Sequence, residues 1–420
     1  MKQGETIMFE ILQENGWEYY IKNNEAYIVG VPDAEKTTLF VPKSIGGYPI
    51  VKIDFYMAPM YGYDSVHLSK NIKFFDASCV RENIANIRVD EENEYFAARD
   101  GILYSKDFKT IISFPPSKKD FNDSCLDGVE IIGESAFDSC DSLISVNIPT
   151  SVVEIGTNAF SFSERLKSVE MFDSVKKIGA GAFGGCGLEN IVLSRNINKL
   201  ECSEYSDDYL GFFSCADFVE FNIPDNIEII GDQTFENCEK LKKIYIPASV
   251  REIGEYVFHG CSALEEIIVS KDNKFYYSDD GVLYSREGTL LYYPQNKKEN
   301  FFTVPDNIIK INAYAFCANN NLKKLMLGND VSEIGRSAFS YSHIETINIP
   351  KSLRAIEKNV FLCSSIKELY IPKSVLYVEM NSDTVGDVNP FRDILILVDK
   401  GSYAEGMCIE YGLKYKIINN

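Results

Sequence analysis

Residues 223–267 contain one motif written twice, because IPDNIEIIGDQTFENCEKLKKIY (223–245) is followed directly by IPASVREIGEYVFHGCSALEEI (246–267). Each copy is about 23 residues long. Alignment pairs Phe235 with Phe258 and Cys238 with Cys261, and it also pairs an Ile-Pro, an Ile-Gly and a leucine. The chain therefore carries an internal repeat.

One copy has too few apolar side chains to offset the conformational entropy lost when it becomes ordered. The copies become stable only if neighbours stack and bury one another's apolar faces in a continuous core. The repeat therefore predicts a solenoid, and it favours one elongated body over the two or three domains that 420 residues would otherwise suggest.

The same spacing recurs along most of the chain. Degenerate copies begin near residue 39, and the pattern sharpens from Ile131 on. One copy carries an insertion at about residues 201–210, after which Phe212 and Cys215 restore the register. The core phenylalanines of the other copies are Phe137, Phe160, Phe183, Phe235, Phe258, Phe316, Phe339 and Phe361.

Within a copy, the L-x-x-V-x-I-P segment alternates in the way typical of a strand. Val146 and Ile148 are expected to face the core, whereas Asn147 faces outward. Proline then ends the strand. The S-V-x-x-I-G segment predicts a second short extended piece, and Ala-Phe-x-x-Cys predicts one helical or 3₁₀ turn with its Phe in the core.

Two longer interruptions, at about residues 89–120 and 269–303, resemble each other. Both place Asp-Gly between alternating apolar and aromatic segments, which is the pattern of a tight β-turn. We expect small β-meanders that project from the edge of the solenoid.

The two ends of the chain differ from the repeats. Residues 1–38 predict an N-terminal β cap with strands on either side of Asn23-Asn24, and residues 39–400 form the solenoid. Residues 401–420 predict a C-terminal cap, with a helix that begins after Ser402 and ends near Tyr411, then Gly412 and a strand.

The combination I-P-x-S-V-x-x-I-G-x-x-A-F-x-x-C-x-x-L-x-x-V resembles the BspA-type leucine-rich repeat, over roughly residues 39–396. The Asp-Gly-Val/Ile-Leu-Tyr insertions and the Gly-Ser-Tyr-Ala-Glu ending resemble that family too. The resemblance implies a β-rich, right-handed repeat coil with parallel strands, short helical turns, two β-meander insertions and end caps. It also implies a bacterial surface-exposed module for binding or adhesion.

Charge excludes one class of partner. Lys plus Arg total 42 against 62 Asp plus Glu, which gives a net charge of −20. Such an acidic chain without a basic stripe repels phosphate backbones, so nucleic-acid binding is not expected. The most apolar short run, residues 394–398, is far too short for a transmembrane helix, so membrane insertion is not expected.

The location of the protein is open between two expectations. Residues 1–20 show charges where a signal peptide has an apolar block, which predicts a cytoplasmic protein for the sequence as given. The family resemblance instead implies a cell-surface or secreted protein if a leader has been removed.

Five of the eleven cysteines occupy one repeat position, three residues after the Phe. We interpret them as small buried side chains with free thiols, because side chains in a ladder run parallel and keep their sulfurs apart. No Cys-x-x-Cys pair supports a zinc site. The repeat-position cysteines are Cys140, Cys186, Cys215, Cys238 and Cys261.

No catalytic, cofactor or metal motif is present. His67, His259 and His343 share no motif and fall at different repeat positions. Asp207-Asp208 and Asp279-Asp280 lack the spaced Asp-x-Asp-x-Asp-Gly calcium loop, and no phosphate-binding glycine loop occurs. We therefore expect no enzyme activity, cofactor or metal.

Three function classes remain. The first is a non-catalytic scaffold that binds a protein, such as a host or cell-surface protein, or a glycan-bearing surface. The second is a structural spacer that holds another element away from a surface, and the third is an enzyme or metal-dependent protein with an unrecognised site. A binder should gather aromatic or apolar residues on its outward face, whereas a spacer should be uniformly polar.

A candidate binding surface follows from the strand alternation. The residue between the two inward strand positions is expected to face outward on one sheet, and several of these residues are large and apolar. Strand propensity alone could also explain such residues. The outward positions are Asn147, Glu170, Val192, Asn222, Tyr245, Ile268, Met326, Asn348 and Tyr370, and the second meander adds Tyr276, Tyr277, Tyr284, Tyr292 and Tyr293.

Overall fold

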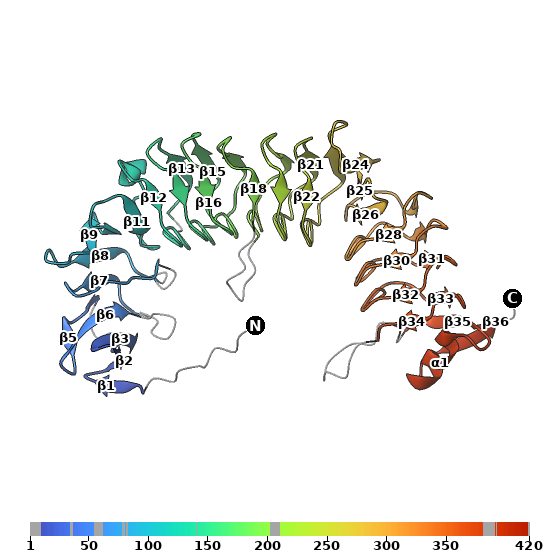
Figure 1. Cartoon of the computed structure of the whole chain (residues 1–420), viewed down its shortest axis with the longest axis horizontal. Coiled ribbons are helices and arrows are strands. Elements are labelled where there is room, and N and C mark those ends of the chain that lie inside the picture. Colours follow the sequence, from blue (N-terminus) through green and yellow to red (C-terminus); the bar gives the residue numbers. More distant parts are fainter. Residues whose placement is uncertain are drawn as a thin grey trace. The chain divides into compact units, whose positions relative to one another are not determined.

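The computed structural model describes residues 10–33, 37–53, 62–77, 80, 83–140, 142–201, 211–380, 391 and 393–418. These residues form a β-solenoid, in which parallel strands from successive coils lie side by side and helix is almost absent (Figure 1). The expected repeat solenoid is confirmed. It divides into two compact units, Met1–Ile197 with Glu201–Ala216, and Asn198–Leu200 with Asp217–Asn420.

The described residues of the first unit form four sheets, with orders β1-β2-β3-β6-β5, β4-β7-β8, β16-β14-β12-β11-β10-β9 and β13-β15-β17. Its strands are β1 Leu12–Glu14, β2 Trp17–Lys22, β3 Glu25–Gly30, β4 Thr38–Phe40, β5 Ser44–Ile45, β6 Tyr48–Ile53, β7 Ser65–Leu68, β8 Asn86–Val89, β9 Phe96–Arg99, β10 Ile102–Ser105, β11 Thr110–Ser113, β12 Ile131–Ile132, β13 Ser145–Ile148, β14 Glu154–Ile155, β15 Ser168–Met171, β16 Lys177–Ile178 and β17 Asn190–Val192, with a 3₁₀ turn η2 at Asp123–Leu126.

In the second unit, the part of the chain that the structure describes forms six sheets, with orders β18-β20-β22, β19-β21-β23, β24-β25-β26-β28-β30, β27-β29-β31, β32-β34 and β33-β35-β36. Its elements are β18 Lys199–Leu200, β19 Glu220–Asn222, β20 Ile229–Ile230, β21 Lys243–Ile246, β22 Glu252–Ile253, β23 Glu266–Val269, β24 Tyr276–Asp279, β25 Val282–Ser285, β26 Thr289–Tyr292, β27 Phe301–Thr303, β28 Lys310–Ile311, β29 Lys324–Met326, β30 Glu333–Ile334, β31 Thr346–Ile347, β32 Ala355–Ile356, β33 Glu368–Ile371, β34 Tyr377–Val378, β35 Leu395–Asp399, α1 Tyr403–Glu410 and β36 Tyr415–Ile418.

Each regular coil contributes two strands to two parallel ladders. In the longer ladder Val146 pairs with Val169, and in the shorter one Ile155 pairs with Ile178. Val146 and Ile148 are buried and Asn147 is exposed, as the alternation predicts. A shift of one residue would turn the apolar set to solvent, so burial fixes the register of both ladders.

The segment around each core Phe is a pair of turns rather than a helix. Residues two before and two after the Phe have positive φ, as at Gln233 (54°) and Asn237 (57°) around Phe235. The N–H groups of these three residues donate to carbonyl oxygens of the following coil at 2.7–3.0 Å. The expected helical turn does not form, because every second N–H bonds across coils instead of along its own coil.

The core phenylalanines stack from coil to coil. Ring centroids of Phe137 and Phe160 are 5.1 Å apart, and those of Phe160 and Phe183 are 5.4 Å apart. Phe235 and Phe258 lie 5.9 Å apart in the second unit. All five rings are buried, so each coil completes the core of the next.

None of the nine cysteines that the structure describes forms a disulfide, as predicted. The buried position after the Phe has a polar role as well, since the thiol of Cys186 donates to the Phe160 carbonyl oxygen at 2.9 Å. Ser163 does the same for Phe137 at 2.8 Å. A small donor thus caps a carbonyl oxygen that the turn leaves open.

The expectation for Cys215 is wrong. Cys215 is exposed with φ of 65°, which is the left-handed position two residues after the core ring. Phe213 therefore holds the repeat register and Ala216 takes the buried position. Residues 202–210, with the predicted insertion and Asp207-Asp208, lie outside the described residues.

The two interruptions are antiparallel meanders, as expected, formed by β9-β10-β11 and β24-β25-β26. One buried asparagine anchors each. Asn273 Nδ2 donates to the carbonyl oxygens of Pro247 (2.8 Å) and Val250 (2.9 Å), and its Oδ1 accepts from Phe275 and Tyr276 N–H. Asn93 makes the equivalent four bonds in the first meander, including those to Ser69 and Ile72.

The predicted secondary structure is present at both ends. Strands β2 and β3 flank Asn23 and Asn24, which have φ of 52° and 59° as a tight hairpin turn requires. At the other end Ser402 accepts from the Glu405 N–H, α1 follows, and Gly412 has φ of 64°. Strand β36 then pairs with β35, so it covers the edge of the last sheet.

Candidate interaction surfaces

The outward face of sheet β19-β21-β23 contains the centre of the predicted surface. Asn222 pairs with Tyr245, and Tyr245 pairs with Ile268, so these three side chains form a row across the sheet. Tyr245 and Ile268 are half-buried. The Ile267 N–H donates to Gly281 O at 3.0 Å, which places the Asp-Gly turn of the meander at the free edge of β23.

The nine outward positions do not lie on one sheet, so that expectation is wrong. Eight of them lie on β13-β15-β17, β19-β21-β23, β27-β29-β31 and β33-β35-β36, and Asn348 directly follows β31. The meander ends the second of these sheets at β23, so Ile268 and Met326 belong to different sheets. Tyr370 is half-buried and its hydroxyl donates to Asp399 Oδ2 at 2.9 Å. Asn348 also has partners, since its amide bonds to the backbone of Leu327 in both directions.

Three of the five meander tyrosines are in the core. Tyr284, Tyr292 and Tyr293 are buried. Burial raises the pKa of Tyr292, and its hydroxyl donates to Phe258 O at 2.6 Å. These three residues therefore do not present a surface to a partner.

The other two tyrosines are half-buried and already engaged. The Tyr276 hydroxyl accepts from the Ile253 N–H at 3.1 Å. The Tyr277 ring stacks on Tyr284 with centroids 5.0 Å apart. The aromatic residues that do reach solvent here are Phe275 and Phe301, each about half exposed, and the pattern of tyrosines did not indicate them.

A groove of about 820 Å³ lies beside the first meander, and the sequence did not predict it. Its floor is the outward face of β7 and β8, with His67, Asn86 and Arg88, and its wall is the Asp100-Gly101 turn. Phe40 on β4 continues the row, since it pairs with His67 and their rings are 5.5 Å apart. The Phe40 side chain is 61% exposed.

The rim of this groove is acidic. Asp90, Glu91 and Glu92 follow β8 directly and line the opening. Lys70 lies 2.6 Å from Glu92, and its hydrogen bond lowers the pKa of the Glu92 carboxyl. These acidic side chains are part of the excess of Asp and Glu that gives the chain its net charge of −20, so the groove favours partners that carry positive charge.

The groove and the predicted face are equivalent places in two copies of one arrangement. Arg88 corresponds to Ile268, and the Ile87 N–H donates to Gly101 O at 2.8 Å as that of Ile267 does to Gly281 O. His67 pairs with Arg88 as Tyr245 pairs with Ile268. The likeness between the two meanders was the signal that could have revealed the groove.

The histidines do not form a shared site. His67 lies in the groove, His343 Nδ1 lies 3.1 Å from Asn320 O, and His259 Nδ1 lies 3.3 Å from Glu236 Oε1. Hydrogen bonds to Cys317 and Glu236 raise the pKa of His259 to about 10. His259 is therefore a cation at neutral pH, and it contacts Glu236 in the preceding coil and the Tyr314 ring beyond the meander.

Across the described ranges, no group of three or more His, Cys, Asp or Glu side chains is arranged to hold a metal ion. Asp280 belongs to the meander turn, with φ of 47°, and its carboxylate lies 3.0 Å from Lys297 Nζ. Among the described residues, the longest helix is α1, with eight residues. No helix in those residues is long and apolar enough to cross a membrane.

Comparison with known proteins identifies the repeat. A family model described as BspA type leucine rich repeat region (6 copies) matches residues 120–210, 209–280 and 291–382, which is more than half of the chain. No curated protein matches the chain significantly.

Three solved structures are similar over most of the chain. A leucine rich cell surface protein from Faecalibacterium prausnitzii A2-165 has 18% identity and a TM-score of 0.49, over 98% of this chain and 95% of that one. A leucine-rich repeat protein from Eubacterium ventriosum has 19% identity and a TM-score of 0.41, over 87% and 83%. The pneumococcal vaccine antigen PcpA has 18% identity and a TM-score of 0.37, over 98% and 99%.

Proposed function

Because the chain belongs to the BspA-type leucine-rich repeat family, we propose that it is a non-catalytic module for protein interaction or adhesion at a bacterial cell surface. Its partner is a protein exposed on a cell or host surface. The outward sheet faces beside the two meanders are the binding surfaces. Residues 1–38 and 401–420 serve as caps that keep the ends of the core from associating.

The observation that carries this proposal is the repeated pairing of a meander with an open sheet face. In the first unit this pairing leaves a groove of about 820 Å³, a size typical of a ligand site. In the second unit it leaves Tyr245 and Ile268 half-buried on the sheet whose edge meets the Asp280-Gly281 turn. Large apolar residues at a partly open position are the residues that dominate protein interfaces.

A spacer would need no such surfaces, and this difference provides the test. The purified protein is used to capture partners from host extracellular extract and from bacterial lysate in parallel. The double variant Tyr245→Ser and Ile268→Ser should lose the captured protein and keep its melting temperature. The matched control is Glu170→Ser with Val192→Ser, which changes outward positions on β15 and β17, away from any meander.

The control pair should capture the same protein as the unaltered chain. If neither extract yields a protein whose capture depends on Tyr245 and Ile268, the outward face of sheet β19-β21-β23 is not a binding site. Phe40→Ser with Arg88→Ser then tests the groove in the same assay. If neither double variant loses a captured protein, the result would favour the alternative that the chain is a structural spacer.

A further inference from the structure

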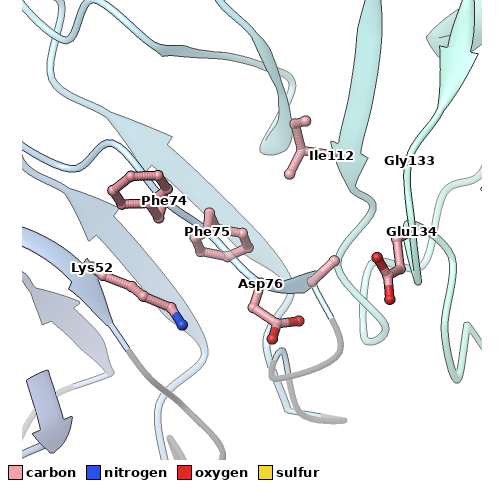
Figure 2. Close-up of a pocket in the computed structure, with 8 residues that line it drawn as sticks. Lys52, Phe74, Phe75, Asp76, Ile112, Gly133 and Glu134 are labelled. Carbon is pink, nitrogen blue, oxygen red and sulfur yellow. The ribbon is translucent and has the colours of Figure 1, made fainter. Parts of the chain in front are cut away.

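The two meanders rejoin the solenoid through the same backbone hydrogen bonds. The Gly133 N–H donates to Ile111 O at 2.9 Å, and the Asn312 N–H donates to Leu290 O at 2.9 Å. Figure 2 shows Gly133 next to Ile112, which lies on the last strand of the first meander. Because the docking is the same, each residue of one meander can be compared with its counterpart in the other.

In the second meander, the chain itself satisfies the N–H groups at the free edge of β23. The Ile267 N–H donates to Gly281 O at 3.0 Å, and the Val269 N–H donates to Ser278 Oγ at 2.9 Å. The serine hydroxyl thus caps a donor that no further strand reaches.

The first meander leaves the same donor open. The counterpart of the serine is Ala98. The Val89 N–H points toward the meander, because the Ile87 N–H donates to Gly101 O at 2.8 Å and alternate residues of a strand direct their N–H groups to the same edge. An alanine side chain has no acceptor atom, and no described residue accepts a hydrogen bond from the Val89 N–H.

The carboxylate of the Asp-Gly turn also differs between the meanders. Asp280 Oδ2 lies 3.0 Å from Lys297 Nζ, and the Lys297 side chain is 7% exposed. Lys118 stands at the position of Lys297, since the N–H of each donates to the carbonyl oxygen of a proline three residues earlier. Within the described part of the chain, Asp100, the counterpart of Asp280, forms no ion pair with Lys118 or with any other residue.

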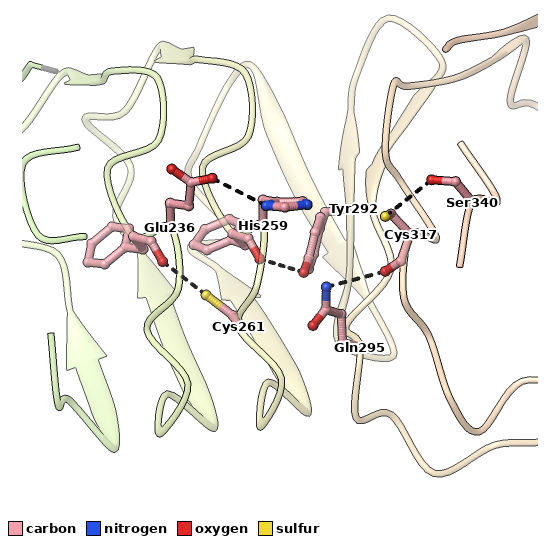
Figure 3. Close-up of polar contacts among 9 residues, drawn as sticks. Glu236, His259, Cys261, Tyr292, Gln295, Cys317 and Ser340 are labelled. Carbon is pink, nitrogen blue, oxygen red and sulfur yellow. Dashed lines mark hydrogen bonds and ion pairs between the residues drawn. The ribbon is translucent and has the colours of Figure 1, made fainter. Parts of the chain in front are cut away.

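Two anchors that precede Lys297 have no counterpart in the first meander. The Tyr292 hydroxyl and the Gln295 amide donate to backbone carbonyl oxygens of the coils on either side, at 2.6 and 3.2 Å (Figure 3). Ser113 and Pro116 stand at these two positions. A serine hydroxyl stays close to its own backbone and a proline side chain has no donor, so the first meander does not position its own lysine in this way.

The groove of about 820 Å³ opens over the free donor and the unpaired carboxylate. Val89, Ala98 and Asp100 all line it. Four of its eleven lining residues are Asp or Glu, and Arg88 is the one Lys or Arg among them. The groove therefore offers a ligand one open N–H donor in a setting with excess negative charge.

We propose that this groove binds a lysine residue of a partner protein, whose ammonium pairs with Asp100 while a backbone carbonyl oxygen of the same segment accepts from the Val89 N–H. The second meander is the model for both contacts, since Lys297 and Ser278 supply the cation and the acceptor from the chain itself. The inference rests on the proposed function, because it names the chemistry that a protein partner offers to the groove.

The direct probe is the peptide Ac-Gly-Lys-Gly-amide, which carries one ammonium and several carbonyl oxygens. The matched peptide with Nε-acetyl-lysine keeps the carbonyl oxygens and lacks the charge. Binding to the full chain is followed by NMR, through the amide signal of Val89 and the methyl signal of Ala98. We expect saturable shifts with the lysine peptide, a downfield shift of the Val89 amide proton, and at least about fivefold weaker binding of the acetylated peptide.

Two substitutions locate the contacts. Ala98→Ser gives the first meander the hydroxyl that caps the N–H group in the second, so it should weaken binding of the lysine peptide by about threefold or more. Asp100→Asn removes the charge and should weaken it by about fivefold or more, and asparagine tolerates the φ of 52° at this position. The matched control Asp272→Asn removes an exposed carboxylate beside the second meander and should leave the affinity unchanged.

Four results would each overturn the inference: equal affinity for the two peptides, no shift at Val89, or an affinity unchanged by Ala98→Ser or by Asp100→Asn in a variant that melts normally. If Ala98→Ser does not fold, Asp100→Asn and the two peptides decide. The inference and the proposed function fail separately. Failed capture in both extracts with intact peptide binding would contradict the proposed function alone. Capture that depends on Phe40 and Arg88 without peptide binding would contradict the lysine site alone.

Discussion

Replacing Asn273 by alanine should destabilise the second meander strongly. The Asn273 side chain is 2% exposed and makes four hydrogen bonds to backbone groups, at 2.8–2.9 Å. Alanine removes all of them and leaves two carbonyl oxygens and two N–H groups without that partner. Each buried group left unsatisfied costs ~1–3 kcal/mol, and partial access to water reduces the sum. We therefore expect the free energy of opening this region to fall by about 3–5 kcal/mol.

Hydrogen exchange measured by mass spectrometry tests this value, because it reports opening free energies segment by segment. Asn273→Ala should reduce protection in residues 247–292 and in the adjoining coils, and leave the first unit unchanged. Asn93→Ala should do the same around the first meander. The control Asn222→Ala removes an exposed side chain and should have little effect. A local decrease in opening free energy below about 1 kcal/mol, or a decrease shared evenly by both units, would refute the reasoning.

Four other outcomes are expected. Phe258→Ala should cost about 3–5 kcal/mol, and the loss of exchange protection should fade beyond the coils of Phe235 and Tyr292; a uniform loss would contradict nearest-neighbour packing. The raised pKa of His259 means that its charge stabilises the fold fully below the ordinary pKa of 6.5 and ceases to do so as pH rises through about 10. The melting-temperature difference between His259→Gln and the unaltered protein should therefore shrink over that window, and a constant difference would contradict the assignment. Removal of residues 401–420 should expose the edge of β35 and cause association in light scattering, and a stable monomer would count against the cap. Titration of thiols in denaturant without reductant should find essentially all eleven cysteines reactive, and fewer than eight would indicate disulfides.

The repeat was enough to predict the fold. The spacing of the core phenylalanines fixed the coil, and the alternation around Val146 predicted which strand residues are buried. Both Asn23-Asn24 and Ser402 marked local structures that depend on nearby backbone groups only. Such signals are local, so they can be interpreted from the sequence without knowledge of the packing.

The turn around each Phe could not be predicted in the same way. Its left-handed residues include Gln233 and Tyr314, which are unusual at positive φ, and hydrogen bonds to the next coil hold them there. The prediction that Cys215 is buried was wrong for the same reason. Phe212 and Phe213 are both phenylalanine, and only their stacking on Phe183 decides which one holds the repeat register.

The candidate surface was predicted in part. Alternation correctly placed Tyr245 opposite Ile268 on the outward side of one sheet. It could not show that the meander ends that sheet, nor that Tyr284 and Tyr293 are buried. Those facts depend on how the meander docks against neighbouring coils, which is a long-range property.

The measurement that tests the central claim most directly is the affinity of a captured partner for the protein and for its Tyr245→Ser, Ile268→Ser double variant, with melting temperatures recorded alongside. If the outward face beside the second meander binds the partner, the double variant should bind at least about tenfold more weakly and melt at nearly the same temperature. An unchanged affinity in a variant that still melts normally would contradict the claim and place the partner elsewhere on the molecule.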